Sequence, residues 1–385
     1  MANVQMICQN FTMITVFADK YLYNIANLLP ENCELKLFSP SKGLPEDLDG
    51  ADALLIRTVT EIDRALVNRL PESLKFIATG SAGTDHVNLQ LLKDRKIAFA
   101  DAAGCNSRSV AEYVATALLL WTEDTAKTPE SLTVGIIGKG HAGTQVNDLL
   151  QSLGMNTICY DPPKEKREEG FESAGLEEVL SADILSFHTP LEHRGVFATY
   201  HWLDEDKLAS RNFDLIINTS RGGVINEQVL LKAYIKGSVE NFIIDVWENE
   251  PLFNDLIAKN AFIKTPHIAG YSKQSKLRAS KMIVESLCRH FELEIPAYEM
   301  EGADEEFSLS NASLKSAQLK DILCKIHPIK EYEKGLKHLI GLPPQKKGPA
   351  FNKLRSEFPL RTEYKHLSLP GFLTKEYPVI KKLGS

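Results

Sequence analysis

Short apolar runs alternate with amphipathic stretches over the first hundred residues of the chain. The runs at residues 13–17, 35–38, 53–56, 76–79 and 97–100 have the length of buried strands. Strands that alternate with helices predict a parallel sheet, because each parallel neighbour needs a crossover connection. A longer apolar segment at residues 110–121 follows Asn106 and Ser107, which are residue types that cap helices. It predicts a buried helix that joins two domains.

A second series of the same kind follows that helix. We expect strands at residues 132–137, 157–160, 184–187, 215–218, 242–246 and 262–264, and a helix at residues 275–290 that returns to the first domain. The pattern then changes, because residues 297–385 contain more Pro and Lys and show weak periodicity. We interpret this tail as a third, smaller α+β domain, and residues 1–12 as an extension ahead of the first strand.

The most informative motif is a glycine-rich loop between the strand at residues 132–137 and a predicted helix. In a dinucleotide-binding loop the first glycine permits a tight turn, the second lets the backbone approach a pyrophosphate, and the third lets the helix pack on the strand. The helix start also favours an anion, because its N–H groups are free. The alternative, a glycine turn without a ligand, fits the complete strand–helix–strand context less well. The residues predicted to hold the dinucleotide are Gly138, Gly140, His141, Ala142 and Gly143.

The choice of dinucleotide depends on Asp161, which ends the next predicted strand 18 residues after Gly143. A carboxylate there accepts hydrogen bonds from the adenosine ribose hydroxyls and repels a 2′-phosphate. NAD is therefore predicted over NADP. Three nearby cations, Lys164, Lys166 and Arg167, weaken that preference.

Polar segments follow three later strands, at the sheet edge where open α/β folds bind ligands. They are residues 220–223, with Arg221, then residues 245–251, which are rich in carboxylates, and residues 266–271, with His267. Each alone has an ordinary explanation, such as a surface salt bridge or a core histidine. Together, behind a nucleotide site, they provide three groups. These are an arginine that can hold a substrate carboxylate, a histidine that can accept a proton, and a carboxylate that can tune the basicity of the histidine. This combination is what hydride transfer requires.

Composition and charge exclude other classes of protein. The chain has 43% hydrophobic and 25% charged residues, which is typical of a globular protein. Its net charge of -7 argues against nucleic-acid binding, and no apolar run reaches the roughly 20 residues of a membrane helix. The six cysteines are scattered without metal-ligand spacing, so we expect reduced thiols, a cytoplasmic protein and no metal.

Over residues 13–292 the chain resembles the D-isomer-specific 2-hydroxyacid dehydrogenases. The matching motifs are the glycine loop, His188-Thr189-Pro190-Leu191, Ser220-Arg221-Gly222, Asp245 with Glu250-Pro251, and His267-Ile268-Ala269-Gly270. The resemblance implies a discontinuous, flavodoxin-like substrate domain (1–106 and 273–296) and a Rossmann NAD-binding domain (107–272). It also implies a C-terminal dimerisation domain (297–385) and a homodimer.

The resemblance also implies roles for single residues. His267 would take the C2 hydroxyl proton as hydride leaves C2, Glu250 would pair with the His267 imidazole, and Arg221 would bind the substrate carboxylate and C2 oxygen. Asp245 would accept a hydrogen bond from the nicotinamide amide. Further implied contacts are Thr189, Thr219, Ser220 and Gly270 to the cofactor, and Thr58, Ser81 and Tyr271 to the substrate. His86 and His188 have no readable carboxylate partner, and we leave both out of the catalysis.

The substrate is the least constrained part of the interpretation. The closest resemblance is to members that oxidise 4-phospho-D-erythronate to 2-oxo-3-hydroxy-4-phosphobutanoate in pyridoxal 5′-phosphate synthesis, on residues 57–60, 82–87, 104–106, 267–271 and 351–355. A phosphate needs cations, so Arg57 and Arg108 are our candidates for it, with structural roles an equal alternative. Other family substrates, 3-phosphoglycerate and glyoxylate or hydroxypyruvate, remain alternatives, as does a non-catalytic NAD-sensing module.

The tail is predicted to make no direct contact with the substrate in the active site. Its apolar positions must nevertheless be buried, and a symmetry-related copy is the partner we expect. The alternative is a tail that folds back on its own chain. The positions concerned are Leu323, Ile326, Leu339, Phe351, Leu354 and Phe358.

Overall fold

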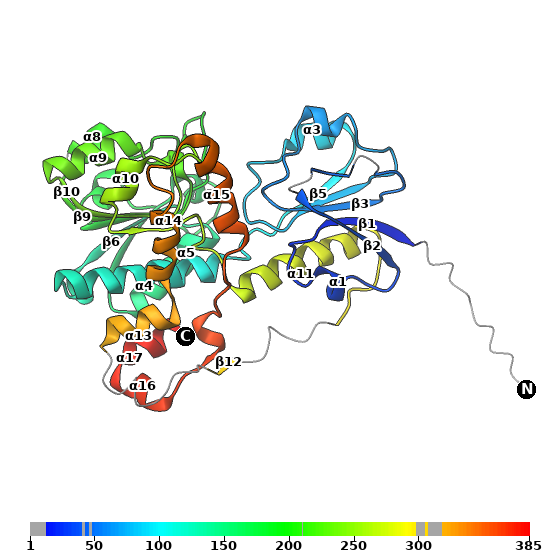
Figure 1. Ribbon diagram of the computed structural model, residues 1–385. Helices are drawn as coiled ribbons and strands as arrows, with labels where there is room; N and C mark the ends of the chain where they lie inside the picture. Colours follow the sequence, from blue (N-terminus) through cyan, green and yellow to red (C-terminus); the bar gives the residue numbers. More distant parts are fainter. Residues whose placement is uncertain (1–12, 41–42, 46–47, 210, 298–304, 307–317) are drawn as a thin grey trace, which may run out of the picture. The chain divides into compact units, whose positions relative to one another are not determined.

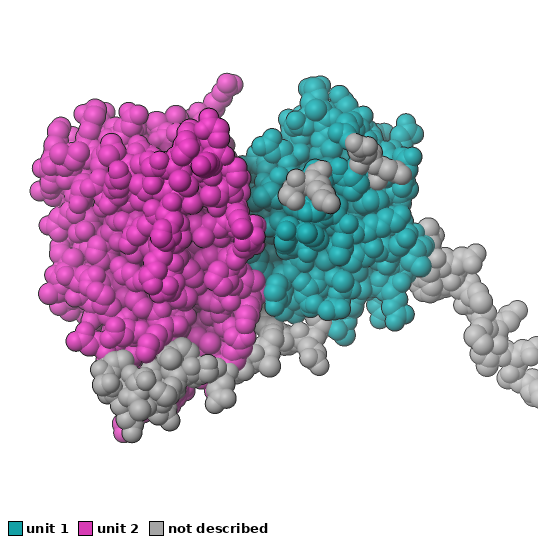
Figure 2. All heavy atoms as spheres, in the orientation of Figure 1, with its two compact units in different colours: residues 1–105, 276–301 teal, residues 106–275, 302–385 magenta. Residues whose placement is uncertain are grey.

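The computed structural model describes residues 13–40, 43–45, 48–209, 211–297, 305–306 and 318–385. The predicted extension at residues 1–12 lies outside them. The chain forms two compact units, coloured separately in Figure 2: residues 1–105 with 276–301, and residues 106–275 with 302–385. The tail is therefore grouped with residues 106–275 instead of forming a compact unit by itself.

Within the described residues, the first unit is built on a parallel five-stranded sheet of order β2-β1-β3-β4-β5, the flavodoxin-like order. Val16 and Phe17 are adjacent on β1 and belong to different apolar clusters, because neighbouring side chains point to opposite faces of a sheet. The Val16 cluster also contains Ile25 of α1 and Ile283 of α11. The strands are β1 (Ile14–Asp19), β2 (Cys33–Phe38), β3 (Ala53–Ile56), β4 (Phe76–Thr79) and β5 (Ala98–Ala100), and the helices are α1 (Ile25–Leu28), α2 (Arg64–Val67), α3 (Leu89–Asp94) and α11 (Lys273–His290), whose first three residues belong to the second unit.

The second unit contains a parallel sheet of six described strands in the order β11-β10-β9-β8-β6-β7. The order reverses between β6 and β8, so ligand binding is expected beside the carboxyl ends of these strands. The Rossmann-like α/β fold predicted from the alternating pattern is confirmed. The strands are β6 (Thr133–Ile137), β7 (Asn156–Tyr160), β8 (Ile184–Phe187), β9 (Phe213–Asn218), β10 (Val239–Ile244) and β11 (Ile263–Lys264), and the helices are α5 (His141–Ser152), α6 (Pro162–Glu165), α7 (Leu176–Leu180), α8 (Glu205–Ala209), α9 (Glu227–Lys236) and α10 (Asp255–Asn260).

Helix α4 (Ser107–Thr125) lies between the sheet of this unit and helices of the tail (Figure 1). Every residue from Ser109 to Thr122 is buried, which explains why the sequence pattern is apolar on all sides of the helix. No described helix is both long and apolar enough to span a membrane.

The tail is mainly helical, whereas the sequence pattern predicted an α+β domain. Its helices are α13 (Leu319–Ile326), α14 (Ile329–Lys337), α15 (Pro344–Ser356), α16 (Gly371–Glu376) and α17 (Pro378–Leu383), and the short strands β12 (Glu305–Glu306) and β13 (Leu367–Ser368) pair in parallel. In α13 the apolar residues Leu319, Ile322, Leu323 and Ile326 recur at helical spacing, so this helix was readable from the sequence although the tail as a whole shows weak periodicity.

The apolar positions of the tail are covered by its own chain. Leu323, Ile326 and Phe358 belong to the apolar cluster around α4, and Leu339 and Phe351 belong to the cluster on the other side of the six-stranded sheet. Burial of these positions therefore requires no second copy of the chain. A homodimer stays a prediction that rests on the resemblance.

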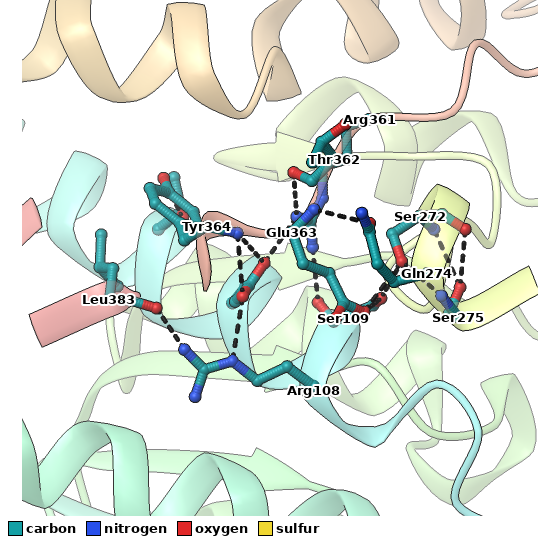
Figure 3. A network of polar contacts seen from close by, with 12 residues as sticks. Arg108, Ser109, Ser272, Gln274, Ser275, Arg361, Thr362, Glu363, Tyr364 and Leu383 are labelled. Carbon is teal, nitrogen blue, oxygen red and sulfur yellow. Dashed lines mark hydrogen bonds and ion pairs between the residues drawn. The ribbon is translucent and has the colours of Figure 1, made fainter. Parts of the chain in front are cut away.

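A buried polar network fixes the tail to the second unit (Figure 3). Arg361 donates to the Glu112 carboxylate on α4 at 2.6 Å, and both side chains are almost fully buried. Glu363 accepts hydrogen bonds from Ser109, at 2.7 Å, and from Ser272, at 2.9 Å. The tail is thus bonded to the first turns of α4 and to the residues immediately before α11.

Candidate active site

The glycine loop lies between β6 and α5. Gly138 has a φ of +90°, a conformation that side chains disfavour, and a Cβ on Gly143 would lie 1.9 Å from the Gly138 carbonyl oxygen. A Cβ on Gly140 would meet nothing within 4 Å. Gly138 and Gly143 are thus required by the turn itself. The open space at Gly140, together with the free N–H groups of His141 and Ala142, suits the approach of an anion.

Asp161 stands at the end of β7, where its carboxylate is fixed by the backbone. Oδ2 accepts a hydrogen bond from the Lys139 N–H at 2.7 Å, and Oδ1 accepts one from the Lys164 N–H at 2.9 Å. Each oxygen keeps a lone pair for another donor. The Lys164 ammonium donates to the Lys139 carbonyl, and the Lys166 ammonium lies over the Phe197 ring. Because both cations are engaged in these contacts, they are less able to attract a 2′-phosphate and so to offset the preference for NAD that Asp161 gives.

Two buried hydroxyls near the strand ends have no hydrogen-bond partner among the described residues. They belong to Thr189, after β8, and Thr219, after β9. Buried polar atoms in folded proteins almost always have partners, so these hydroxyls are suited to bind a ligand. Both were predicted as cofactor contacts from the family motif. The next hydroxyl, on Ser220, donates to Asn218 Oδ1 at 2.9 Å.

Arg221 lies on a loop that is locked to the loop after β10. A Cβ on Gly222 would lie 2.0 Å from the Trp247 carbonyl, so only glycine permits this approach. The buried Asn218 side chain donates to the Arg221 carbonyl at 2.9 Å. Asn218 was not singled out from the sequence, although a polar residue that closes an apolar strand is a usable signal. The Arg221 guanidinium donates to the Ser220 carbonyl at 2.8 Å.

Asp245 is fully buried at the end of β10 and accepts three hydrogen bonds. The donors are the Thr265 hydroxyl at 2.6 Å and the N–H groups of Ile268 and Ala269 at 2.8 and 2.9 Å. Burial raises the pKa of Asp245, and the His267 imidazole and these hydrogen bonds act against it. Asp245 therefore holds the loop that carries His267, a structural role beside the predicted contact with the cofactor.

Glu250 and His267 form a direct pair. Glu250 Oε2 lies 2.8 Å from His267 Nδ1, and Glu250 Oε1 accepts the Trp247 N–H at 2.8 Å. Burial raises the pKa of Glu250, but the His267 imidazole, Arg355 and the Trp247 N–H outweigh burial, and the pKa lies below its usual value. The backbone of His267 has a φ of +59°, and its N–H donates to the Asp245 carbonyl at 2.7 Å. With Nδ1 held by the carboxylate, Nε2 is the nitrogen left for a substrate.

Gly270 and Tyr271 follow this histidine. A Cβ on Gly270 would lie 2.4 Å from the Asn106 amide nitrogen, so the loop packs tightly on the start of α4. The Tyr271 ring contacts the Phe358 ring of the tail, with a centroid distance of 5.8 Å. Tail residues therefore lie against a predicted substrate contact, which the sequence interpretation did not expect.

The other predicted substrate contacts belong to the first unit. Arg57 donates to the buried carboxylate of Asp19 at 2.8 Å, and its guanidinium lies over the Tyr21 ring. Thr58 is exposed, and Ser81 is half-buried. Their roles as substrate contacts stay predictions.

Three residues considered from the sequence have structural contacts in the molecule. Arg108 donates to Glu112 at 3.0 Å and to the Leu383 carbonyl, which favours the structural explanation over phosphate binding. His188 is half-buried beside the Ser186 hydroxyl, and desolvation lowers its pKa to about 3, so the ring stays neutral. His86 lies 3.0 Å from the Thr79 hydroxyl. Within the described part of the chain, no group of three or more His, Cys, Asp or Glu side chains could hold a metal ion.

The chain is similar to several known proteins. Residues 110–269 match the model of the NAD-binding domain of D-isomer-specific 2-hydroxyacid dehydrogenases. The chain is 36% identical to the erythronate-4-phosphate dehydrogenase of Bacteroides thetaiotaomicron over 339 residues, which cover 87% of this chain and 93% of that protein. It is 40% identical to the enzyme of that name from Idiomarina loihiensis over 282 residues, which cover 72% of this chain and 73% of that protein.

A solved structure shows the same fold. The D-lactate dehydrogenase of Aquifex aeolicus, complexed with NAD and lactic acid, is 26% identical to the chain and superposes with a TM-score of 0.58. The likeness covers 72% of this chain and 95% of that protein.

Proposed function

The chain belongs to the erythronate-4-phosphate dehydrogenase family of the D-isomer-specific 2-hydroxyacid dehydrogenases, and on that premise we propose that it oxidises 4-phospho-D-erythronate at C2. The product would be 2-oxo-3-hydroxy-4-phosphobutanoate, in the synthesis of pyridoxal 5′-phosphate. The names of its relatives support this substrate, and the pair formed by Glu250 and His267 carries the chemistry.

In the proposed reaction, His267 Nε2 accepts the proton of the C2 hydroxyl. Glu250 keeps the imidazole in the tautomer whose Nδ1 carries hydrogen, and its negative charge stabilises the imidazolium that forms. Arg221 binds the substrate carboxylate and polarises the C2 oxygen. The contact of Gly222 with the Trp247 carbonyl keeps the Arg221 loop beside the loop that carries Glu250.

The residues at the strand ends fit NAD, which accepts the hydride from C2 when bound. The two unpartnered hydroxyls of Thr189 and Thr219 and the open space at Gly140 support this fit. Asp161, with a free lone pair on each oxygen, would hold the adenosine ribose.

A glycine substitution tests the cofactor site independently of catalysis. Gly140→Ala is expected to leave the free energy of unfolding unchanged, because its Cβ meets no protein atom within 4 Å. We expect it to weaken NAD binding at least about tenfold, since the backbone there would approach the pyrophosphate. Titration calorimetry measures the binding. Gly143→Ala is the matched control, and it should cost about 1–3 kcal/mol of stability because its Cβ overlaps the Gly138 carbonyl. Wild-type NAD affinity in Gly140→Ala would place the cofactor elsewhere.

A substrate panel tests the reaction. The full-length protein is assayed for NADH formation with 4-phospho-D-erythronate, D-erythronate, 3-phosphoglycerate and D-glycerate, and with NAD against NADP. We expect the highest kcat/KM for 4-phospho-D-erythronate with NAD, and at least about a tenfold loss without the phosphate, because a hydrogen bond between charged groups is worth about 1.5–3 kcal/mol. A higher kcat/KM for 3-phosphoglycerate would assign the chain a different substrate. NAD binding without turnover of any acid would indicate a sensing module.

A further inference from the structure

The tail brings a cation to the proposed acid–base pair. Arg355, on α15, places its guanidinium Nη1 3.9 Å from Glu250 Oε2, and its side chain is only 19% exposed. The same carboxylate oxygen lies 2.8 Å from His267 Nδ1. The guanidinium and the imidazole therefore share one oxygen of Glu250.

Arg355 also contacts the predicted substrate residue Tyr271. Burial lowers the pKa of the Arg355 guanidinium, but Tyr271, Glu250 and Asp245 outweigh burial, partly through a hydrogen bond to Tyr271, and the pKa is raised. The guanidinium is thus charged under all conditions of assay. Its buried Nε has no hydrogen-bond partner among the described residues, so a structural network does not account for the whole group.

Helix α15 is firmly attached to the second unit. Phe351 is fully buried and contacts the Phe253 ring, with a centroid distance of 5.9 Å. The ammonium of Lys347, whose side chain is 9% exposed, lies 2.6 Å from Asp255 Oδ1. A half-buried guanidinium on an anchored helix is a fixed charge, unlike an arginine on a mobile surface.

We propose that Arg355 is a positioning residue that holds Glu250 and Tyr271 in place and limits how strongly Glu250 attracts a proton to His267. A carboxylate that belonged to His267 alone would favour the imidazolium before substrate arrives, and an imidazolium accepts no proton. A guanidinium on the shared oxygen offsets part of that negative charge. The proposal rests on the acid–base role proposed above for His267.

Other charged groups surround the pair and would stay in place when Arg355 is replaced. Asp245 lies at the end of β10, and its carboxylate acts on His267. Glu227 of α9 acts on Glu250, and burial raises the pKa of Glu227 to about 8. Glu248, on the same loop as Glu250, is a further carboxylate and bonds to His201 at 2.7 Å. Replacing Arg355 therefore removes one positive charge and leaves these acidic groups in place, so His267 should bind a proton more readily.

Replacing Arg355 by neutral residues tests the proposal in the pH profile of alcohol oxidation. In Arg355→Met we expect the acidic limb of kcat/KM to move to higher pH by about one pH unit, because His267 must be neutral to act and the lost cation had disfavoured the imidazolium. Arg355→Gln should give the same shift, and Arg355→Lys should give less. Lys353→Met, on the same helix with a side chain that is 71% exposed, is the control and should leave the profile unchanged.

A second measurement needs no turnover. The histidine ring signals of the full chain with saturating NAD are followed by NMR against pH, and His267 is assigned by its absence in His267→Asn. The titration midpoint of His267 should move to higher pH in Arg355→Met and not in Lys353→Met. An unmoved midpoint overturns the proposal. So does an unshifted profile with a raised KM for phosphorylated acids alone, which would make Arg355 a phosphate ligand. If the protein oxidises no hydroxy acid, the titration midpoint of His267 in Arg355→Met still tests the proposal about Arg355.

Discussion

His267→Ala is expected to lower kcat for hydroxy acid oxidation by about 100- to 10,000-fold, the contribution of general acid–base catalysis. The loss arises because no other group takes the place of Nε2, while Nδ1 is held by Glu250 at 2.8 Å. NAD affinity should stay near the wild-type value, since the glycine loop and Asp161 do not contact this histidine. Stopped assays measure turnover, and titration calorimetry measures NAD binding.

The backbone of His267 calls for a second variant. Its φ of +59° is a conformation that asparagine adopts more readily than alanine. His267→Asn should therefore be less destabilised than His267→Ala, although both lose the pair with Glu250, and it should still show the kinetic loss. Glu250→Gln should shift the pH profile and retain measurable turnover. Near-wild-type turnover in His267→Asn would remove histidine from the mechanism.

Arg361→Met is expected to give the largest loss of stability, about 3–5 kcal/mol, because it leaves a buried carboxylate without its main cation. Glu112 is fully buried and lies 2.6 Å from Arg361. Urea unfolding measures the difference. Arg108→Met is the matched control, since it removes the other cation that contacts Glu112. The Arg108 side chain is 19% exposed, so this variant should lose less stability than Arg361→Met.

The pH dependence of that deficit tests its cause. Burial raises the pKa of Glu112 above its usual value, while Arg361 and Arg108 act to lower it. Without Arg361 the pKa should rise further. A carboxyl with a raised folded-state pKa contributes stability that is present below its unfolded pKa and lost as pH rises through its folded pKa. The deficit of Arg361→Met should thus be smaller near about pH 5 than near about pH 8. A deficit independent of pH, or one that Glu112→Gln does not relieve, would contradict this account.

The central strands were the part of the fold most readable from the sequence. Residues 53–56, 76–79 and 184–187 were predicted with the bounds that β3, β4 and β8 have, because central strands of a covered parallel sheet are apolar throughout. Strand β10 begins at Val239, three residues before the predicted start. The predicted start was late because Glu240 is exposed and Asn241 is polar, so neither residue extends the apolar run. The apolar run in a sequence marks the buried part of a strand, and the hydrogen-bonded strand can extend beyond that part.

The site could be predicted where its chemistry is local. The glycine loop and its following Asp161 form one continuous motif, and the structure places them together at the ends of β6 and β7. Thr265 and Arg355 act on Asp245 and Glu250, which lie 20 or more residues away in the chain, and no spacing in the sequence predicts such contacts. Arg355 is 105 residues from Glu250, so only the folded tail relates them.

The contact between Gly222 and the Trp247 carbonyl has a consequence for motion. Two loops whose backbones touch cannot move closer together, so the Gly222 contact sets a lower limit on the distance between the Arg221 loop and the Glu250 loop. This limit keeps the substrate clamp from collapsing onto the proton acceptor. Since a misplacement of about 1 Å can cost about 100-fold in rate, this limit helps the reacting groups to keep their alignment.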